Sequence, residues 1–105
     1  MSNRVYTITR RYNNGNILYH GYYEEDRLNR LDGPAEIHYH ENGKKSCEIY
    51  FINDIIHRLD GPAVIYFNEF GLLIDSVSEY WVHGEQYFPA SLDEFKKMVK
   101  LLMFK

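Results

Sequence analysis

The residues that could do chemistry in this chain occur twice. The hexapeptide Arg-Leu-Asp-Gly-Pro-Ala stands at residues 30–35 and again at residues 58–63. An arginine can bind an anion such as a phosphate, and an aspartate can transfer protons or cap a turn. Neither aspartate has a nucleophile or base as an evident partner, so catalysis is not predicted.

The repetition itself favours a structural role for these residues, because residues that recur with a repeat usually build the repeat. We expect each arginine to pair with a carboxylate or to stack on an aromatic ring of the neighbouring repeat. We expect each aspartate to accept a backbone N–H in a turn, each glycine to take positive φ, and each proline to start a strand. The residues assigned to this structural repeat are Arg30, Asp32, Gly33, Pro34, Arg58, Asp60, Gly61 and Pro62.

Two histidines form a second candidate. His38 and His40 are two residues apart, so they would share one face of a strand and could hold a metal ion together. The second copy has Tyr66 and Asn68 at the corresponding positions, which shows that the pattern does not require histidine. We therefore predict surface polar residues and no metal site. The single cysteine, Cys47, cannot form an internal disulfide and is expected to be a small core residue.

The elements that position these residues follow a period of 28 residues. Gly15, Gly43 and Gly71 are 28 apart, and Asn-Gly pairs end at the first two of them, which predicts hairpin turns. Apolar and polar residues alternate after each hexapeptide, as in a strand. The sequence therefore predicts a mainly β fold: an antiparallel meander of β-hairpin repeats with about six or seven strands over residues 1–88. The least regular member is expected at residues 5–12.

Adjacent aromatic residues recur once per repeat, as Tyr22-Tyr23, Tyr50-Phe51 and Tyr80-Trp81. Neighbouring residues of a strand point to opposite faces of the sheet. Both faces should therefore carry aromatic rings, with the three tyrosines that come first in each pair on the same face.

The C-terminal segment changes to helical spacing. Ser91 and Glu94 form a capping-box pattern, and apolar residues then recur every three or four positions from Phe95 to Leu102. We predict a helix over residues 92–103, within a segment of residues 89–105 that caps the open end of the last repeat. The whole chain of residues 1–105 is expected to be one domain.

Composition excludes some classes of function. The net charge is −3 and the pI is about 5.9, which argues against direct binding of nucleic acid. The sequence has no apolar run long enough for a membrane span and no apolar core of a signal peptide. We expect a cytoplasmic protein, in the cytoplasm of the host cell if it is viral, with no cofactor.

The aromatic pairs, the two Arg-Leu-Asp-Gly-Pro-Ala units and the following glycines resemble the MORN-type repeats, in the variant that reads His-Arg-x-Asp-Gly-Pro-Ala. The resemblance covers about residues 15–88 and departs from the pattern at Asn29, at Asp54 and at residues 87–89. It implies stacked β-hairpins with roles in binding and scaffolding, as in proteins of phages, large DNA viruses and bacterial toxin–antitoxin loci.

These observations predict a non-enzymatic protein-binding module. The resemblance suggests an inhibitor of a host defence protein, such as an anti-CRISPR, or an antitoxin-like immunity protein. Two alternatives stay open: a self-assembling module that forms a homodimer through a sheet edge, and a binder of small ligands or nucleotides in a cleft between sheet and helix, with Arg30 and Arg58 contacting phosphate. Tyrosine and tryptophan are enriched at interfaces. The candidate interface residues are Tyr22, Tyr50, Tyr80, Trp81, His38, His40 and Tyr66.

Overall fold

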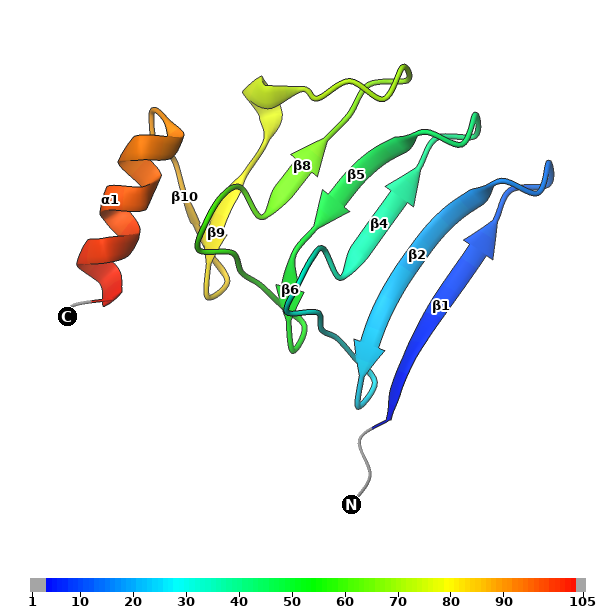
Figure 1. Cartoon of the computed structure of the whole chain (residues 1–105), viewed down its shortest axis with the longest axis horizontal. Coiled ribbons are helices and arrows are strands. Elements are labelled where there is room, and N and C mark those ends of the chain that lie inside the picture. Colours follow the sequence, from blue (N-terminus) through cyan, green and yellow to red (C-terminus); the bar gives the residue numbers. More distant parts are fainter. Residues whose placement is uncertain (1–3, 104–105) are drawn as a thin grey trace.

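A computed structural model describes residues 4–103, so residues 1–3 and 104–105 of the predicted domain lie outside the described chain. The described chain is mainly antiparallel β-sheet with one C-terminal α-helix, which confirms the predicted fold class (Figure 1). The strands are β1 Val5–Arg11, β2 Ile17–Glu24, β3 Arg27–Leu28, β4 Glu36–Tyr39, β5 Lys45–Ile49, β6 Phe51–Ile52, β7 Ile55–Ile56, β8 Val64–Tyr66, β9 Tyr80–Val82 and β10 Glu85–Tyr87.

The main sheet has the strand order β1-β2-β4-β5-β8, and three short hairpins (β2–β3, β6–β7 and β9–β10) continue it on one side. Backbone hydrogen bonds join these hairpins: Arg30 N–H donates to the Phe51 carbonyl at 3.3 Å, and Arg58 N–H donates to the Trp81 carbonyl at 3.0 Å. The described chain has ten strands instead of six or seven, because β5 ends just before Tyr50 and β6 begins after it, and because the two-residue strands β3 and β7 are additional to those predicted.

The hairpin turns at the far end of the main sheet form as predicted. Gly15 and Gly43 have φ of 89° and 93°, a region that glycine adopts without steric strain. The Asn42 side chain accepts the Lys44 N–H at 2.9 Å and donates to the Glu69 carbonyl of the next turn at 2.7 Å. The N-terminal strand β1 pairs with β2 in one register as far as Arg10, and the register shifts between Arg10 and Arg11, within the segment predicted to be the least regular.

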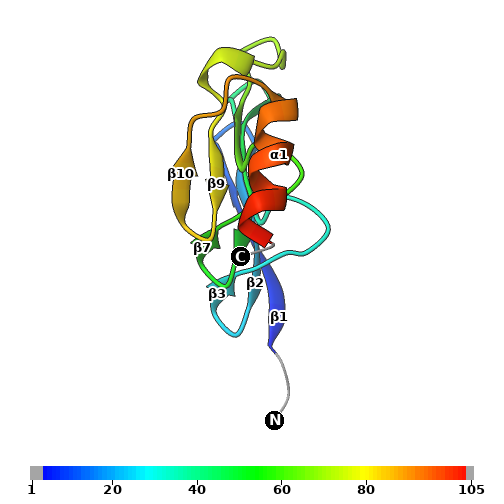
Figure 2. The same ribbon diagram turned by 90° about the vertical axis from the view of Figure 1, so that its left-hand side faces the viewer.

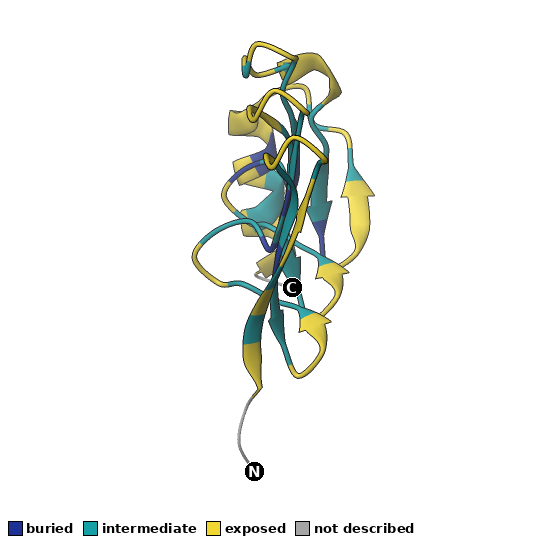
Figure 3. Ribbon diagram, turned by 90° about the vertical axis from the view of Figure 1, so that its right-hand side faces the viewer, coloured by how far each residue is buried: buried dark blue, intermediate teal, exposed yellow. Residues whose placement is uncertain are grey.

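The molecule is a thin slab with extents of 48 × 43 × 17 Å. Figure 2 shows that the helix and the two hexapeptide loops lie on the same side of the sheet. Because a single layer can bury little, few of the described side chains are fully buried (Figure 3). The buried apolar residues are Ala35, Ile37, Ala63, Val64, Val82 and Phe95.

The helix α1 spans Leu92–Met103, as predicted. The Glu94 N–H donates to the Ser91 hydroxyl at 3.1 Å, which is one half of the capping box. The Glu94 carboxylate accepts the N–H of Ala90 at 3.2 Å, one residue before the expected donor. Phe95 is 1% exposed and packs on the ring of Tyr80, with 4.6 Å between ring centroids. None of the described helices is both long and apolar enough to cross a membrane.

Candidate binding groove between the hexapeptide loops

Each hexapeptide arginine lies over a tyrosine ring of the sheet. The Arg30 guanidinium carbon is 4.0 Å from the ring centroid of Tyr22, and that of Arg58 is 4.1 Å from the ring centroid of Tyr50. A cation over an aromatic face is attracted by the ring quadrupole, and Arg also gains contact area by stacking. The first two tyrosines of the predicted aromatic row are therefore partly covered by the chain's own arginines.

The arginines also hold the loops closed. Arg58 Nη1 donates to the Pro62 carbonyl at 3.1 Å, and its Nε donates to the Asp60 carboxylate at 2.9 Å. Arg30 makes the equivalent bonds, both at 3.1 Å, to Pro34 and Asp32. Each arginine thus bonds to the backbone and the aspartate of its own loop and lies on a tyrosine ring, which is the kind of structural role predicted for it.

The predicted roles of Asp and Gly within the hexapeptide were wrong in detail. Among the described residues, Asp32 and Asp60 accept from the arginine Nε and not from a backbone N–H. Gly33 and Gly61 do not have positive φ. A Cβ on Gly33 would lie 2.9 Å from the Arg30 guanidinium carbon, and one on Gly61 would lie 3.2 Å from that of Arg58. A side chain at either position would therefore displace the arginine that folds back over it.

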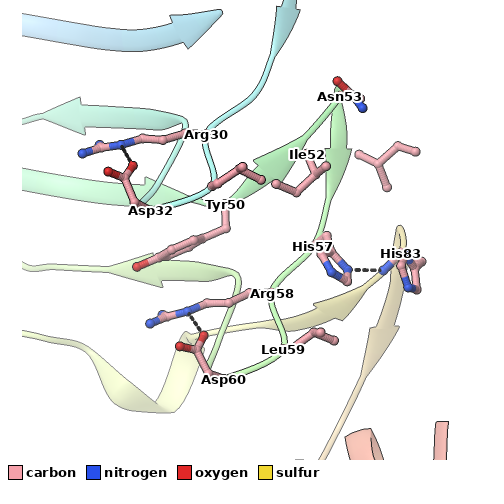
Figure 4. A pocket seen from close by; sticks show the side chains of 13 residues that line it. Arg30, Asp32, Tyr50, Ile52, Asn53, His57, Arg58, Leu59, Asp60 and His83 are labelled. Atoms are coloured by element: carbon pink, nitrogen blue, oxygen red, sulfur yellow. Dashed lines mark hydrogen bonds and ion pairs between the residues drawn. The ribbon is translucent and has the colours of Figure 1, made fainter. Parts of the chain in front are cut away.

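A groove of about 650 Å³ lies between the two hexapeptide loops. Figure 4 shows Arg30 with Asp32 on one side of it, Arg58 with Asp60 on the other, and Tyr50 between them. Other residues that line it are Leu31, Gly33, Ile52, Asn53, Ile55, His57, Leu59 and His83. Leu31 is 88% exposed and Ile55 is 49% exposed, so apolar side chains of the groove face solvent.

The next interval along the repeat is covered by the chain itself. A smaller hollow of about 220 Å³ lies between the second hexapeptide loop and helix α1, and Leu102 and Met103 of the helix line it. Leu59, which corresponds to Leu31 in the second hexapeptide, lines this hollow and is half-buried. Helix α1 thus lies beside the second hexapeptide loop, and no described helix lies beside the first one.

Two stacked histidines close one end of the groove. The rings of His57 and His83 are 4.3 Å apart, and His57 Nδ1 accepts the backbone N–H of His83 at 2.9 Å. Burial lowers the pKa of His57, and the neighbouring His83 lowers it further. In the preceding repeat Asn29 makes the equivalent bond: its side-chain oxygen accepts the backbone N–H of Asn53 at 3.0 Å.

Replacing His57 by asparagine should reduce the loss of stability on acidification. Because the pKa of His57 is lowered in the fold, the unfolded chain binds the proton more readily. The contribution of His57 is therefore present above its ordinary pKa of about 6.5 and is lost as the pH falls through the lower folded value. In His57→Asn the acceptor remains, as Asn29 shows, but it does not titrate. The measurement is the urea midpoint between about pH 7 and pH 5.

The control for this prediction is His20→Asn, because His20 lies on β2, away from the groove, and bonds to Thr9. This variant removes a histidine without changing the contact between His57 and His83. An undiminished loss of stability in His57→Asn would show that the His57–His83 contact is not sensitive to pH.

The opposite face of the sheet carries a second set of the candidate residues, in hydrogen bonds with two glutamates. His38 bonds to Glu36 at 2.9 Å. The Trp81 indole donates to Glu79 at 2.8 Å and the Tyr66 hydroxyl donates to the same carboxylate at 3.3 Å. The structure therefore does not bring the seven candidate interface residues together.

Of the seven, Tyr22, Tyr50 and Tyr80 lie on the face that carries the loops and the helix, where Arg30, Arg58 and Phe95 cover their rings. His40 bonds through Nε2 to the Phe67 carbonyl of the next repeat at 3.1 Å. Within residues 4–103, no group of three or more His, Cys, Asp or Glu side chains is placed to hold a metal ion.

The remaining candidates from the sequence lie elsewhere than expected. Cys47 is half-buried opposite His38 and Tyr66, and burial, with a smaller effect of nearby glutamates, raises the pKa of its thiol to about 11. A cleft between sheet and helix exists, but it is lined by residues such as Leu73 and Phe88. Arg30 and Arg58 line the groove between the loops instead, so the geometry predicted for phosphate binding was wrong.

The groove residues Leu31, Ile55 and His57 were not predicted from the sequence as binding residues. A signal was present: Leu31 is an apolar residue inside a turn sequence, between two charged residues, where it cannot face the sheet together with Arg30.

No family model, no curated protein and no solved structure matches this chain.

Proposed function

We propose that this chain is a non-enzymatic protein-binding module and that its partner docks on the groove between the two hexapeptide loops. The observation that carries the proposal is the exposure of Leu31 and Ile55. Leu59 also lines this groove, but it lies beside Leu102 and Met103 of helix α1 and is half-buried, whereas Leu31 is 88% exposed. A partner that places apolar side chains over Leu31 would complete the same packing in trans.

The composition of the groove supports a protein partner. Its apolar centre, with Leu31 and Ile55, is flanked by Tyr50 and by two arginines, and the exposed carboxylates of Asp32 and Asp60 form a charged rim. This is the usual anatomy of a protein interface, in which aromatic residues and arginine concentrate at the centre. The arginines are already bonded within their own loops, which favours a preformed binding surface over catalysis.

The resemblance to MORN-type repeats specifies the setting of this proposal. The partner would be a host or toxin enzyme, and the chain would act in the cytoplasm of the cell as an inhibitor of a defence protein or as an antitoxin-like immunity protein. A thin slab with a preformed groove can block an enzyme surface without undergoing a large conformational change.

The test is capture of a stoichiometric partner from a bacterial lysate on the immobilised chain. Replacing Leu31 by glutamate would place an unpaired charge at the centre of the interface, so we expect retention to fall at least about tenfold. Leu72→Glu is the matched control, because Leu72 is 63% exposed in a hairpin turn at the other end of the sheet. Equal retention by the two variants, or no stoichiometric partner from any lysate, would contradict the proposal.

A further inference from the structure

Strand β1 is the outermost strand of the main sheet, and its outer edge carries free backbone groups. The Arg4 carbonyl accepts the N–H of Glu25 at 2.8 Å, and the Tyr12 N–H donates to the Asn16 carbonyl at 2.8 Å. Backbone groups of a strand alternate in direction. The even-numbered residues from 4 to 12 therefore bond to β2, and Val5, Thr7, Thr9 and Arg11 turn their N–H and C=O groups outward.

The two ends of the sheet differ. At the C-terminal end, helix α1 packs on the last hairpin through Phe95 and Tyr80. At the N-terminal end, β1 is seven residues long and five of these residues are exposed. An uncovered edge of this length is a template for another strand.

We propose that β1 pairs antiparallel with β1 of a second copy of this chain, with the two-fold axis at Ile8. In this register Thr7 lies opposite Thr9 of the second copy and Val5 lies opposite Arg11. The outward backbone groups of odd-numbered residues then meet one another, as an antiparallel ladder requires. This inference does not depend on the groove and stands or falls separately from the proposed function.

The length of the overlap and charge together select this register among the symmetric ones: the axis at Ile8 pairs residues 4–12, whereas an axis at Tyr6 would pair only residues 4–8 of the described strand. With the axis at Ile8, Arg10 faces Tyr6 of the second copy and Arg4 faces Tyr12, so no like charges lie directly opposite. An axis at Thr7 would place Arg4 opposite Arg10, and an axis at Arg10 would place two copies of Arg10 opposite each other. Like charges directly opposite destabilise a pair of strands. An axis at Thr9 would pair only residues 6–12, a shorter overlap than the axis at Ile8 gives.

The facing side chains are also complementary. Threonine pairs such as Thr7 with Thr9 are favourable across strands.

Disulfide trapping tests the register in the full chain with Cys47→Ser as the background. Ile8→Cys would face its own copy across the two-fold axis at a Cα separation of about 4.5 Å, which suits a disulfide. Thr7→Cys and Thr9→Cys are the matched controls, because these residues would meet their own copies only in other registers. We expect Ile8→Cys to form crosslinked dimer at least about tenfold faster than either control under mild oxidation. Equal rates, or a preference for position 7 or 9, would overturn the proposed register.

Sedimentation of the unmodified chain tests the pairing itself. One strand edge is a small interface, so we expect reversible dimerisation with a dissociation constant of about 10–100 µM. Thr7→Pro removes an outward N–H and should leave a folded monomer, since proline is tolerated at an edge. Ile8→Pro removes an N–H that bonds to β2 and reports the cost of disturbing the fold. A chain that stays monomeric at about 500 µM would overturn the proposal, as would a Thr7→Pro variant that is folded and still dimeric.

Discussion

Replacing Phe95 by alanine is expected to destabilise the fold by about 3 kcal/mol, the largest effect of any single substitution considered for this chain. Phe95 is the only large side chain of the described residues that is almost fully buried, at 1% exposure. Its removal takes a whole ring out of the contact with Tyr80 and leaves a cavity under the helix. Urea unfolding followed by far-UV circular dichroism measures the change, with Leu101→Ala as the control because Leu101 is 70% exposed on the same helix.

The reason for this large effect lies in the repeat. Tyr22 and Tyr50 are each covered by the arginine of the following loop, but no third hexapeptide follows Tyr80. Phe95 takes the place of that arginine and ties the helix to the sheet. If Phe95→Ala and Leu101→Ala changed the free energy of unfolding equally, helix α1 would not act as the cap of the last repeat.

Replacing Arg58 by alanine is expected to lower the free energy of unfolding by about 2 kcal/mol. Arg58 combines a stacked ring contact with Tyr50 and a hydrogen bond to the Pro62 carbonyl, and its side chain is 23% exposed. Arg58→Lys should recover only a small part of the loss, because an ammonium group cannot stack on the ring and bond to the carbonyl in the same way. The free energies of unfolding of the unchanged chain, Arg58→Ala and Arg58→Lys are measured by denaturant unfolding.

Asp60→Ala separates the loop contacts from the ion pair. The Asp60 side chain is 81% exposed, and exposed ion pairs contribute little, so we expect a loss of less than about 1 kcal/mol. Arg30→Ala should resemble Arg58→Ala, because the two arginines have equivalent partners at nearly equal distances. A small effect for both arginines, or an effect of Asp60→Ala as large as that of Arg58→Ala, would mean that the hexapeptide loops do not stabilise the sheet through arginine stacking.

Much of the fold was accessible from local sequence signals. The bounds of helix α1 and the turns at Gly15 and Gly43 follow from short patterns of capping and turn residues, and the structure has them where they were predicted. The roles of Asp60 and Gly61 were assigned wrongly because their environment is set by Arg58, which folds back over the loop. This contact within one loop depends on a side-chain direction that residue preferences do not specify.

The groove could not be predicted, because it depends on contacts between segments far apart in the sequence. Leu31 and Leu59 have the same neighbours on both sides in identical hexapeptides, yet Leu31 is 88% exposed while Leu59 lies beside Leu102 and Met103 of the helix. The difference arises from what packs on each loop. No local pattern distinguishes the two leucines. They differ because helix α1 lies beside the second loop and no described helix lies beside the first one.

The central claim is that the repeated residues build the scaffold and that the open groove at Leu31 binds the partner. The most direct measurement is the amount of partner retained by immobilised Leu31→Glu relative to the unchanged chain, at a temperature where thermal unfolding shows both to be folded. We predict at least a tenfold loss of retention with an unfolding midpoint changed by no more than about 2 °C. Full retention by the folded Leu31→Glu variant would contradict the claim.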